Sequence, residues 1–129
     1  MIRLRSLLCS LAVLLTMLPM LAIANDHGGG GGGAEPMVFT VNLGKENYLQ
    51  FGVVLETATP EAKVALGAFK PKIQHRIILL MADKNIANLR TLAGKKELAE
   101  ELVDLANEVI GETYKTGVSE ALFTSFLIQ

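Results

Sequence analysis

Two neighbouring stretches of the chain, Met37–Leu43 and Tyr48–Thr57, carry an apolar side chain at every second position. These residues are Phe39, Val41, Leu43, Leu49, Phe51, Val53 and Leu55. A period of two is typical of a strand that is buried on one face. The four residues Gly44–Asn47 lie between the stretches, so the pattern predicts a β-hairpin with a short turn.

A helix-start signal follows the hairpin. Thr59 can cap a helix through its hydroxyl, Pro60 suits the first helical position, and Glu61 places a negative charge near the positive end of the helix dipole. The helical stretch is expected to run to Asp83. Pro71 should kink it or split it in two, because proline lacks the N–H group that the helix needs.

Two later segments are also interpreted as helical. Ile73–Met81 has a composition that would suit a buried strand as well. Lys95–Gly111 is clearer, because Leu98, Leu102 and Leu105 recur at helical spacing and Gly111 is a plausible stop. The polar residues expected to face water are Lys96, Glu97, Glu100, Glu101, Asp104, Asn107 and Glu108.

Val118–Gln129 predicts a last strand that is apolar on both faces. With regular alternation, its two faces carry Leu122, Phe126 and Ile128, and Ala121, Phe123 and Leu127. We expect such a strand to be covered on both sides, by helices or by a neighbouring subunit. The predicted order is therefore β-β-α-α-β in one small domain of the α/β (α+β) class.

Residues 1–24 have the pattern of an export signal. Arg3 and Arg5 precede an almost wholly apolar run, Leu7–Leu21, and the small-x-small motif Ala22-Ile23-Ala24 follows. Cleavage after this motif is predicted. The alternative is an uncleaved signal anchor, since about 20 apolar residues span a bilayer. In either case the positive-inside rule leaves the domain outside the cytoplasm.

Residues 25–36 are predicted to be a linker, because Gly28–Gly33 is an unbroken glycine run that is costly to order. A phosphate-binding loop is not indicated, since no strand precedes the run and no GK[ST] sequence follows it. The folded domain is expected to comprise residues 37–129. Cys9 lies in the signal, so the domain would have no disulfide.

Charge argues against nucleic acid as a partner. The chain carries 12 Lys+Arg and 13 Asp+Glu, and loss of Arg3 and Arg5 with the signal would leave the domain more acidic, whereas nucleic-acid-binding domains present a basic face. Residues suited to catalysis are sparse: the histidines are His27 and His75, and no GxSxG, HExxH or calcium-loop sequence occurs. We therefore expect a non-enzymatic interaction module without a cofactor.

One alternative is a metal site created by cleavage. A new N-terminus at Asn25-Asp26-His27 would offer a free amine, two deprotonated amides and an imidazole. Copper(II) and nickel(II) prefer such a square-planar nitrogen set. The hypothesis depends on cleavage at that one bond.

Basic side chains gather around Pro71. They are Lys70, Lys72, His75 and Arg76, and Lys72 and Arg76 share a helix face because they are four residues apart. Lys70, Lys72 and Arg76 are candidate partner-binding residues for an acidic partner. The alternative is a solvated rim beside an apolar helix face.

Motifs along Met37–Gln129 resemble the FliL family of flagellar basal-body-associated proteins. They are Phe39–Leu43, Tyr48–Gln50 and Val54–Glu56 in the hairpin, Pro71–Ile73 leading into Ile77–Leu80, Leu92–Leu98, Asn107, and the terminal strand Leu122–Gln129. The terminal strand is the most specific of them. Five motifs in the family's order make the resemblance stronger than any one of them does.

The resemblance implies a fold similar to stomatin/prohibitin-type domains and homo-oligomeric rings. It also implies a place in the periplasm, at the inner membrane and the flagellar basal body. There, family members sit beside the motor stator proteins, support torque or motor stability, and are not enzymes. Phe123, Phe126 and Ile128 on the last strand are then candidate subunit-interface residues.

The chain departs from the family pattern in one place. Typical members keep an uncleaved membrane helix, whereas the apolar segment here ends in a cleavage motif. The alternative is therefore a soluble FliL-like periplasmic protein with a partner outside the motor.

Overall fold

The structure, a computed structural model, describes residues 35–129, which belong to one compact unit. Its elements are β1 (Met37–Leu43), β2 (Asn47–Thr57), α1 (Pro60–Ala68), α2 (Lys70–Ala82), α3 (Ile86–Leu89), α4 (Leu92–Ile110) and β3 (Val118–Ile128). The predicted α/β (α+β) class and single small domain are confirmed. The predicted signal segment, the glycine run and the N-terminal metal motif fall outside the described residues. None of the described helices is both long and apolar enough to cross a membrane.

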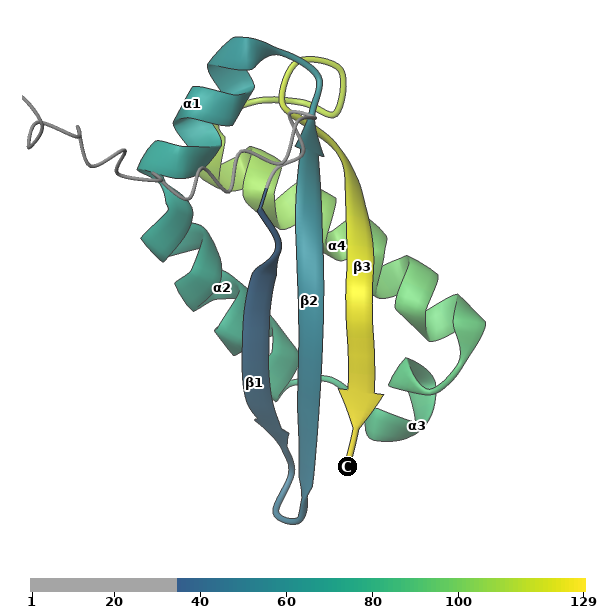
Figure 1. The fold of residues 1–129 in the computed structure, drawn as a ribbon. Coiled ribbons are helices and arrows are strands. Elements are labelled where there is room, and N and C mark those ends of the chain that lie inside the picture. Colours follow the sequence, from purple (N-terminus) through teal and green to yellow (C-terminus); the bar gives the residue numbers. More distant parts are fainter. Residues whose placement is uncertain (1–34) are drawn as a thin grey trace, which may run out of the picture. The chain divides into compact units, whose positions relative to one another are not determined.

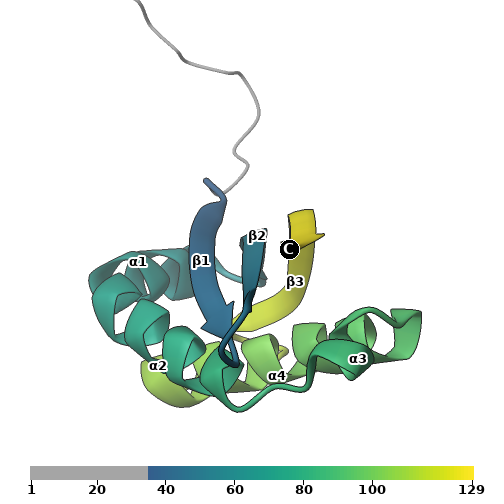
Figure 2. The same ribbon diagram turned by 90° about the horizontal axis from the view of Figure 1, so that it is seen from below.

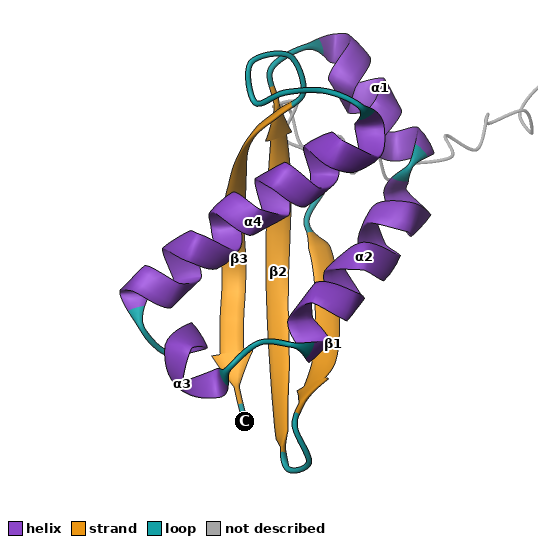
Figure 3. Ribbon diagram, turned by 180° about the vertical axis from the view of Figure 1, so that it is seen from behind, coloured by secondary structure: helices purple, strands orange, loops and turns teal. Residues whose placement is uncertain are grey.

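The strands form one antiparallel sheet in the order β1-β2-β3, so β2 is central and its two neighbours are edge strands (Figure 1). The described helices all lie on one face of this sheet (Figure 2). Seen from behind, α2 runs beside β1 and α4 crosses β3 and β2 obliquely (Figure 3). Residues 35–129 therefore form two layers, and no element among them covers the other face of the sheet.

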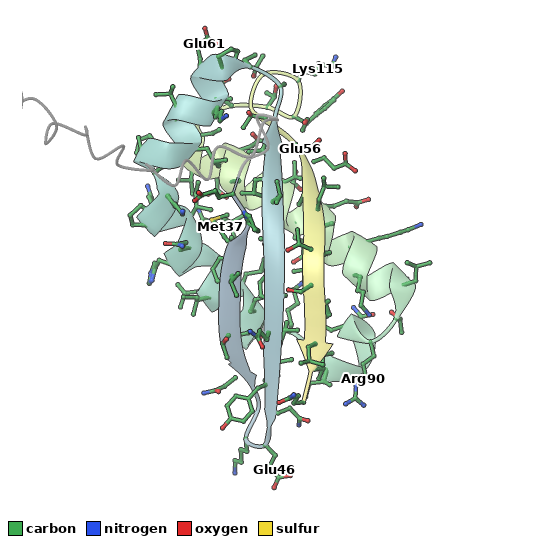
Figure 4. All side chains as sticks on the ribbon, in the orientation of Figure 1. Met37, Glu46, Glu56, Glu61, Arg90 and Lys115 are labelled. Carbon is green, nitrogen blue, oxygen red and sulfur yellow. The ribbon has the colours of Figure 1, made fainter. Side chains whose placement is uncertain are left out.

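The hydrophobic core lies between the sheet and the helices. The predicted alternation of the hairpin is confirmed, since the apolar positions of β1 and β2 are buried and the intervening β1 residues are exposed. The helices contribute Ile73, Ile77, Met81, Leu89, Leu98, Leu102 and Leu105. Burying each such side chain contributes about 1.5–3 kcal/mol. Charged side chains such as Glu46, Glu61 and Lys115 lie at the two ends of the described domain, away from this core (Figure 4).

The hairpin turn is one residue shorter than predicted. Asn47 pairs with Leu43, so the turn consists of Gly44, Lys45 and Glu46. Gly44 has a φ of 71°, a left-handed conformation that glycine adopts without strain.

The predicted long helix is split into α1 and α2. Thr59 caps α1 as predicted, its hydroxyl accepting a hydrogen bond from the Ala62 N–H at 3.1 Å. The break falls at Phe69, and Pro71 occupies the first turn of α2. A proline there costs little, because the N–H groups of a first helical turn have no partner within the helix.

α4 begins three residues before the predicted start at Lys95. The hydroxyl of Thr91 accepts a hydrogen bond from the Gly94 N–H at 2.9 Å and thereby caps the helix before Leu92. Gly111 ends the helix as predicted, with a φ of 72°. The short α3 before it, capped by the side chain of Asn85, was not predicted.

The predicted faces of β3 are wrong in one respect. Gly52 pairs with Ser125 but Val53 pairs with Phe123, so Thr124 is an extra residue that forms a bulge. The bulge places Phe123 on the same face as Phe126, and both contact the core. Leu122 and Leu127 point to the other face and are 38% and 49% exposed. Among the residues that the structure describes, helices therefore cover β3 on one side only.

Candidate functional site

The candidate basic cluster lies on α2, but its cations have different surroundings. The guanidinium of Arg76 faces α4 and donates two parallel hydrogen bonds to the carboxylate of Glu108, at 3.0 and 3.1 Å. This bidentate geometry is the strong form of an Arg–carboxylate pair. The two residues are 32 positions apart in the chain and join α2 to α4. Arg76 is therefore engaged in a contact within the domain and is not free for a partner.

The Arg76–Glu108 pair shifts both pKa values in the direction of the charged forms. Hydrogen bonding from Arg76, and then its positive charge, lowers the pKa of Glu108, and Lys72 adds a smaller contribution in the same direction. The same carboxylate raises the pKa of Arg76. Both side chains remain partly open to solvent, which limits what the pair contributes to stability.

Lys70, Lys72 and His75 are exposed on α2. Lys70 also lines a cavity of about 230 Å³ between α1 and the sheet, whose other walls include Lys63, Leu66 and Met37. Within residues 35–129, the ion pairs are Arg76–Glu108 and Lys84–Glu101. Lys70 and Lys72 are therefore the cations of the cluster that can meet an acidic partner without breaking an ion pair.

Further along α2, two large apolar side chains are exposed, a feature that sequence reasoning missed. Ile78 and Leu79 are 48% and 58% exposed. Ile78 and Ala82 line a groove of about 300 Å³ together with Thr40 and Asn42 of β1. The run Ile77–Met81 already indicated that some of these side chains would be exposed, because five consecutive apolar residues cannot all lie on one face of a helix.

The candidate interface residues Phe123, Phe126 and Ile128 lie together on the helix side of β3, partly buried. The Phe123 and Phe126 rings meet edge to face with centroids 5.2 Å apart, and each lies 6.1 Å from the Phe51 ring. The Lys95 ammonium sits 5.0 Å from the Phe126 centroid, a favourable cation–π distance. These side chains complete the edge of the core.

Asn107 is a correction to the predicted water-facing side of α4. It is only 6% exposed. Its amide nitrogen donates a hydrogen bond to the carbonyl oxygen of Val118 at 2.8 Å, and its amide oxygen accepts one from the Val118 N–H at 2.7 Å. Asn107 therefore fastens the end of α4 to the start of β3.

The acidic face of α4 does more than keep the domain in solution. Glu108 forms an ion pair with Arg76 of α2, and Glu101 forms one with Lys84, which follows α2. Glu97 accepts a hydrogen bond from the Asn88 side chain at 3.3 Å. The sequence indicated the charged face, but these partners depend on how the helices pack.

The described residues offer little for metal chemistry. In residues 35–129 no three His, Cys, Asp or Glu side chains lie close enough together to hold a metal ion. Ser119 donates its hydroxyl hydrogen bond to the Glu56 carbonyl oxygen at 3.3 Å rather than to a histidine. The features with a geometry suited to contact are thus the α2 surface and the free edge of β3.

Comparison with known proteins supplies the family. The family model described as "Flagellar basal body-associated protein FliL" matches residues 35–129, which are the residues the structure describes. The "Flagellar protein FliL" of Escherichia coli (strain K12) is 30% identical over 93 residues, which cover 70% of this chain and 60% of the relative. The protein of the same name from Shigella flexneri matches to the same extent.

The chain thus spans about 60% of the length of these curated relatives. The resemblance noted in the strand, helix and terminal motifs agrees with both comparisons. The matched range includes both candidate surfaces, α2 and β3. This chain belongs to the FliL family of flagellar basal body-associated proteins.

Proposed function

We propose that this protein is a non-enzymatic component of the flagellar basal body that acts in the periplasm beside the motor stator proteins and supports motility. The observation that carries the proposal is the family match over the whole described fold, residues 35–129. A small two-layer domain with exposed contact surfaces suits a scaffold role. Self-association of several copies, as a ring, belongs to the same proposal.

The surface proposed to meet the stator proteins is the exposed side of α2. Lys70 and Lys72 offer positive charge, and Ile78 and Leu79 offer apolar area next to the groove at β1. Contact surfaces of this kind combine an apolar centre with a polar rim. Arg76 contributes indirectly, because its pairing with Glu108 fixes α2 against α4. The expected partner segment is acidic with an apolar anchor.

Localisation in living cells tests the basal-body role. An epitope tag placed within Gly28–Gly33, ahead of β1, avoids the described elements. Foci that coincide with flagellar bases are expected. A diffuse signal in flagellated cells would contradict the motor role and favour a FliL-like protein with another periplasmic partner. The N-terminal residue of the purified protein, read by mass spectrometry, would then decide between a cleaved signal and an anchor.

A charge-reversal experiment tests the α2 surface. The Lys70→Glu/Lys72→Glu variant should fold, since both residues are exposed, and should reduce swimming in soft agar and crosslinking to the stator proteins. The matched control is Lys45→Glu/Lys115→Glu, which changes net charge equally at the hairpin turn and in the loop after α4. Equal motility of the two variants would show that α2 is not the contact surface.

A further inference from the structure

The cavity of about 230 Å³ between α1 and the sheet opens onto the hydrophobic core. It lies where the junction of α1 and α2 passes the start of β1, beside the labelled Met37 (Figure 4). Its floor consists of Met37, Leu55 and Ile73, which are 8%, 2% and 0% exposed. Leu66 of α1 adds an apolar wall. A ligand in this cavity would therefore contact core side chains directly.

The cavity exists because α1 packs loosely on the sheet. Of its nine residues, Ala62 is the buried one and Leu66 is partly buried. Lys63, Leu66 and Gly67 share one helix face, since they are three and four residues apart, and all three line the cavity. A Cβ atom at Gly67 would have nothing within 4 Å. Protein interiors are close-packed, so an unfilled apolar space of this size indicates a ligand site.

The charged residues of the lining leave one net positive charge at the mouth. Lys63, Lys70 and Glu35 are exposed, so they lie at the rim above the buried floor. Within residues 35–129, none of the three takes part in an ion pair. Two ammonium groups and one carboxylate therefore favour a ligand with a single negative charge.

The rest of the lining narrows the ligand further. It includes no aromatic ring and no amide or hydroxyl side chain, so it offers nothing that would stack on a base or orient a sugar. An apolar cavity of about 150 Å³ in another protein is large enough for benzene. A cavity of about 230 Å³ is thus large enough for a short alkyl chain.

We propose that this cavity binds a small amphiphile with one alkyl chain and one anionic head, of the medium-chain fatty-acid class. The chain would lie over Met37, Leu55 and Ile73, with the head at Lys63 and Lys70. The site does not depend on the motor role. It is also separate from the proposed stator contact, because Lys72, Ile78 and Leu79 do not line it and Lys70 alone belongs to both.

Calorimetric titration of the purified full chain with decanoate, below its micelle concentration, tests the site. One decanoate is expected to bind per chain and to raise the thermal unfolding temperature, because a ligand that binds the folded state stabilises it. Decyltrimethylammonium, with the same chain and a cationic head, should bind at least about tenfold more weakly. Acetate, which has the head without the chain, should not bind. Decyl phosphate, titrated in parallel, distinguishes a carboxylate from a phosphate as the preferred head.

Two kinds of variant separate the chain from the head. Gly67→Leu fills the mouth and should abolish decanoate binding, yet it should fold, because its Cβ meets no atom and leucine favours the helix. Val64→Leu is its control on the exposed side of α1 and should bind normally. Lys63→Gln and Lys70→Gln should each weaken binding by about threefold, since both ammonium groups are open to solvent. Lys72→Gln, outside the lining, should not.

Three results would overturn the proposal. Equal binding of decanoate and decyltrimethylammonium would show adsorption to exposed apolar surface. Decanoate binding that survives in a folded Gly67→Leu variant would place the ligand elsewhere. A native full chain that binds neither decanoate nor decyl phosphate would show that the cavity is not a site for such ligands. Motility and localisation do not enter these readouts, so failure here leaves the basal-body role untouched.

Discussion

The side chain of Asn107 satisfies both backbone polar groups of Val118, with hydrogen bonds of 2.8 and 2.7 Å. A side-chain amide can do this because it has a donor and an acceptor side by side, in the same arrangement as a peptide group. The contact is buried and lies where the last helix passes into the last strand. It sets the position of β3 relative to α4.

Asn107→Ala is expected to lower the free energy of unfolding by about 2–4 kcal/mol, because it leaves a buried donor and a buried acceptor of Val118 without partners. Urea unfolding followed by circular dichroism would measure the change. Asn42→Ala, at an exposed position of β1, is the control and should change stability little. An Asn107→Ala variant as stable as the control would contradict the assigned role of the two hydrogen bonds.

Two glycines should respond to alanine in opposite directions. A Cβ atom at Gly117 would collide with the Asn107 side-chain oxygen and lie 3.0 Å from the Thr113 carbonyl oxygen, whereas a Cβ at Gly67 in α1 would have nothing within 4 Å. Gly117→Ala should destabilise the fold by about 1–3 kcal/mol. Gly67→Ala should stabilise it by up to about 1 kcal/mol, because alanine favours the helix. Thermal unfolding of both variants would check the signs.

The start of α4 depends on the Thr91 hydroxyl, which accepts from the Gly94 N–H and donates to the Asn88 carbonyl oxygen at 2.7 Å. Thr91→Ala should cost about 1 kcal/mol. Thr91→Ser keeps the hydroxyl and should restore most of the stability. If both variants lose the same amount in chemical denaturation, the methyl group rather than the cap accounts for the loss.

The Arg76–Glu108 pair predicts a pH dependence. Because the folded pKa of Glu108 is lowered, its contribution is present above the unfolded value of about 4.3 and is lost as pH falls through the lowered pKa. The native chain should therefore exceed Glu108→Gln in stability near neutral pH, and the difference should vanish in strong acid. Added salt should reduce the difference at neutral pH. Urea titrations at both pH values would test this, and a constant difference would refute it.

Local signals predicted the local elements well. The alternation in β1 and β2, the Thr59 cap and the Gly111 stop each depend on residues within one or two turns of the chain, and the structure has all three. Thr91 carried the signal for the earlier start of α4, but apolar periodicity alone placed that start at Lys95.

Features that depend on packing could not be read from the chain. By helix geometry Asn107 lies about half a turn from Leu98, on the wet side, yet it is buried because the chain returns over it at Val118. The bulge at Thr124 depends on the register with β2, where Gly52 leaves room for the Thr124 hydroxyl. The cations of α2 were evident in sequence, but the partner of Arg76 was not.

The strand order gives β2 two neighbours that differ greatly in how far away they are along the chain. β1 joins it through a three-residue turn, whereas β3 reaches it only after about 60 intervening residues, and distant pairings of this kind form slowly. A two-stranded hairpin alone is marginal in water, so the early β1–β2 unit has little persistence until β3 docks. The domain should therefore fold in one cooperative step. Until β3 docks, the apolar Leu49–Leu55 stretch should stay exposed and accessible to chaperones.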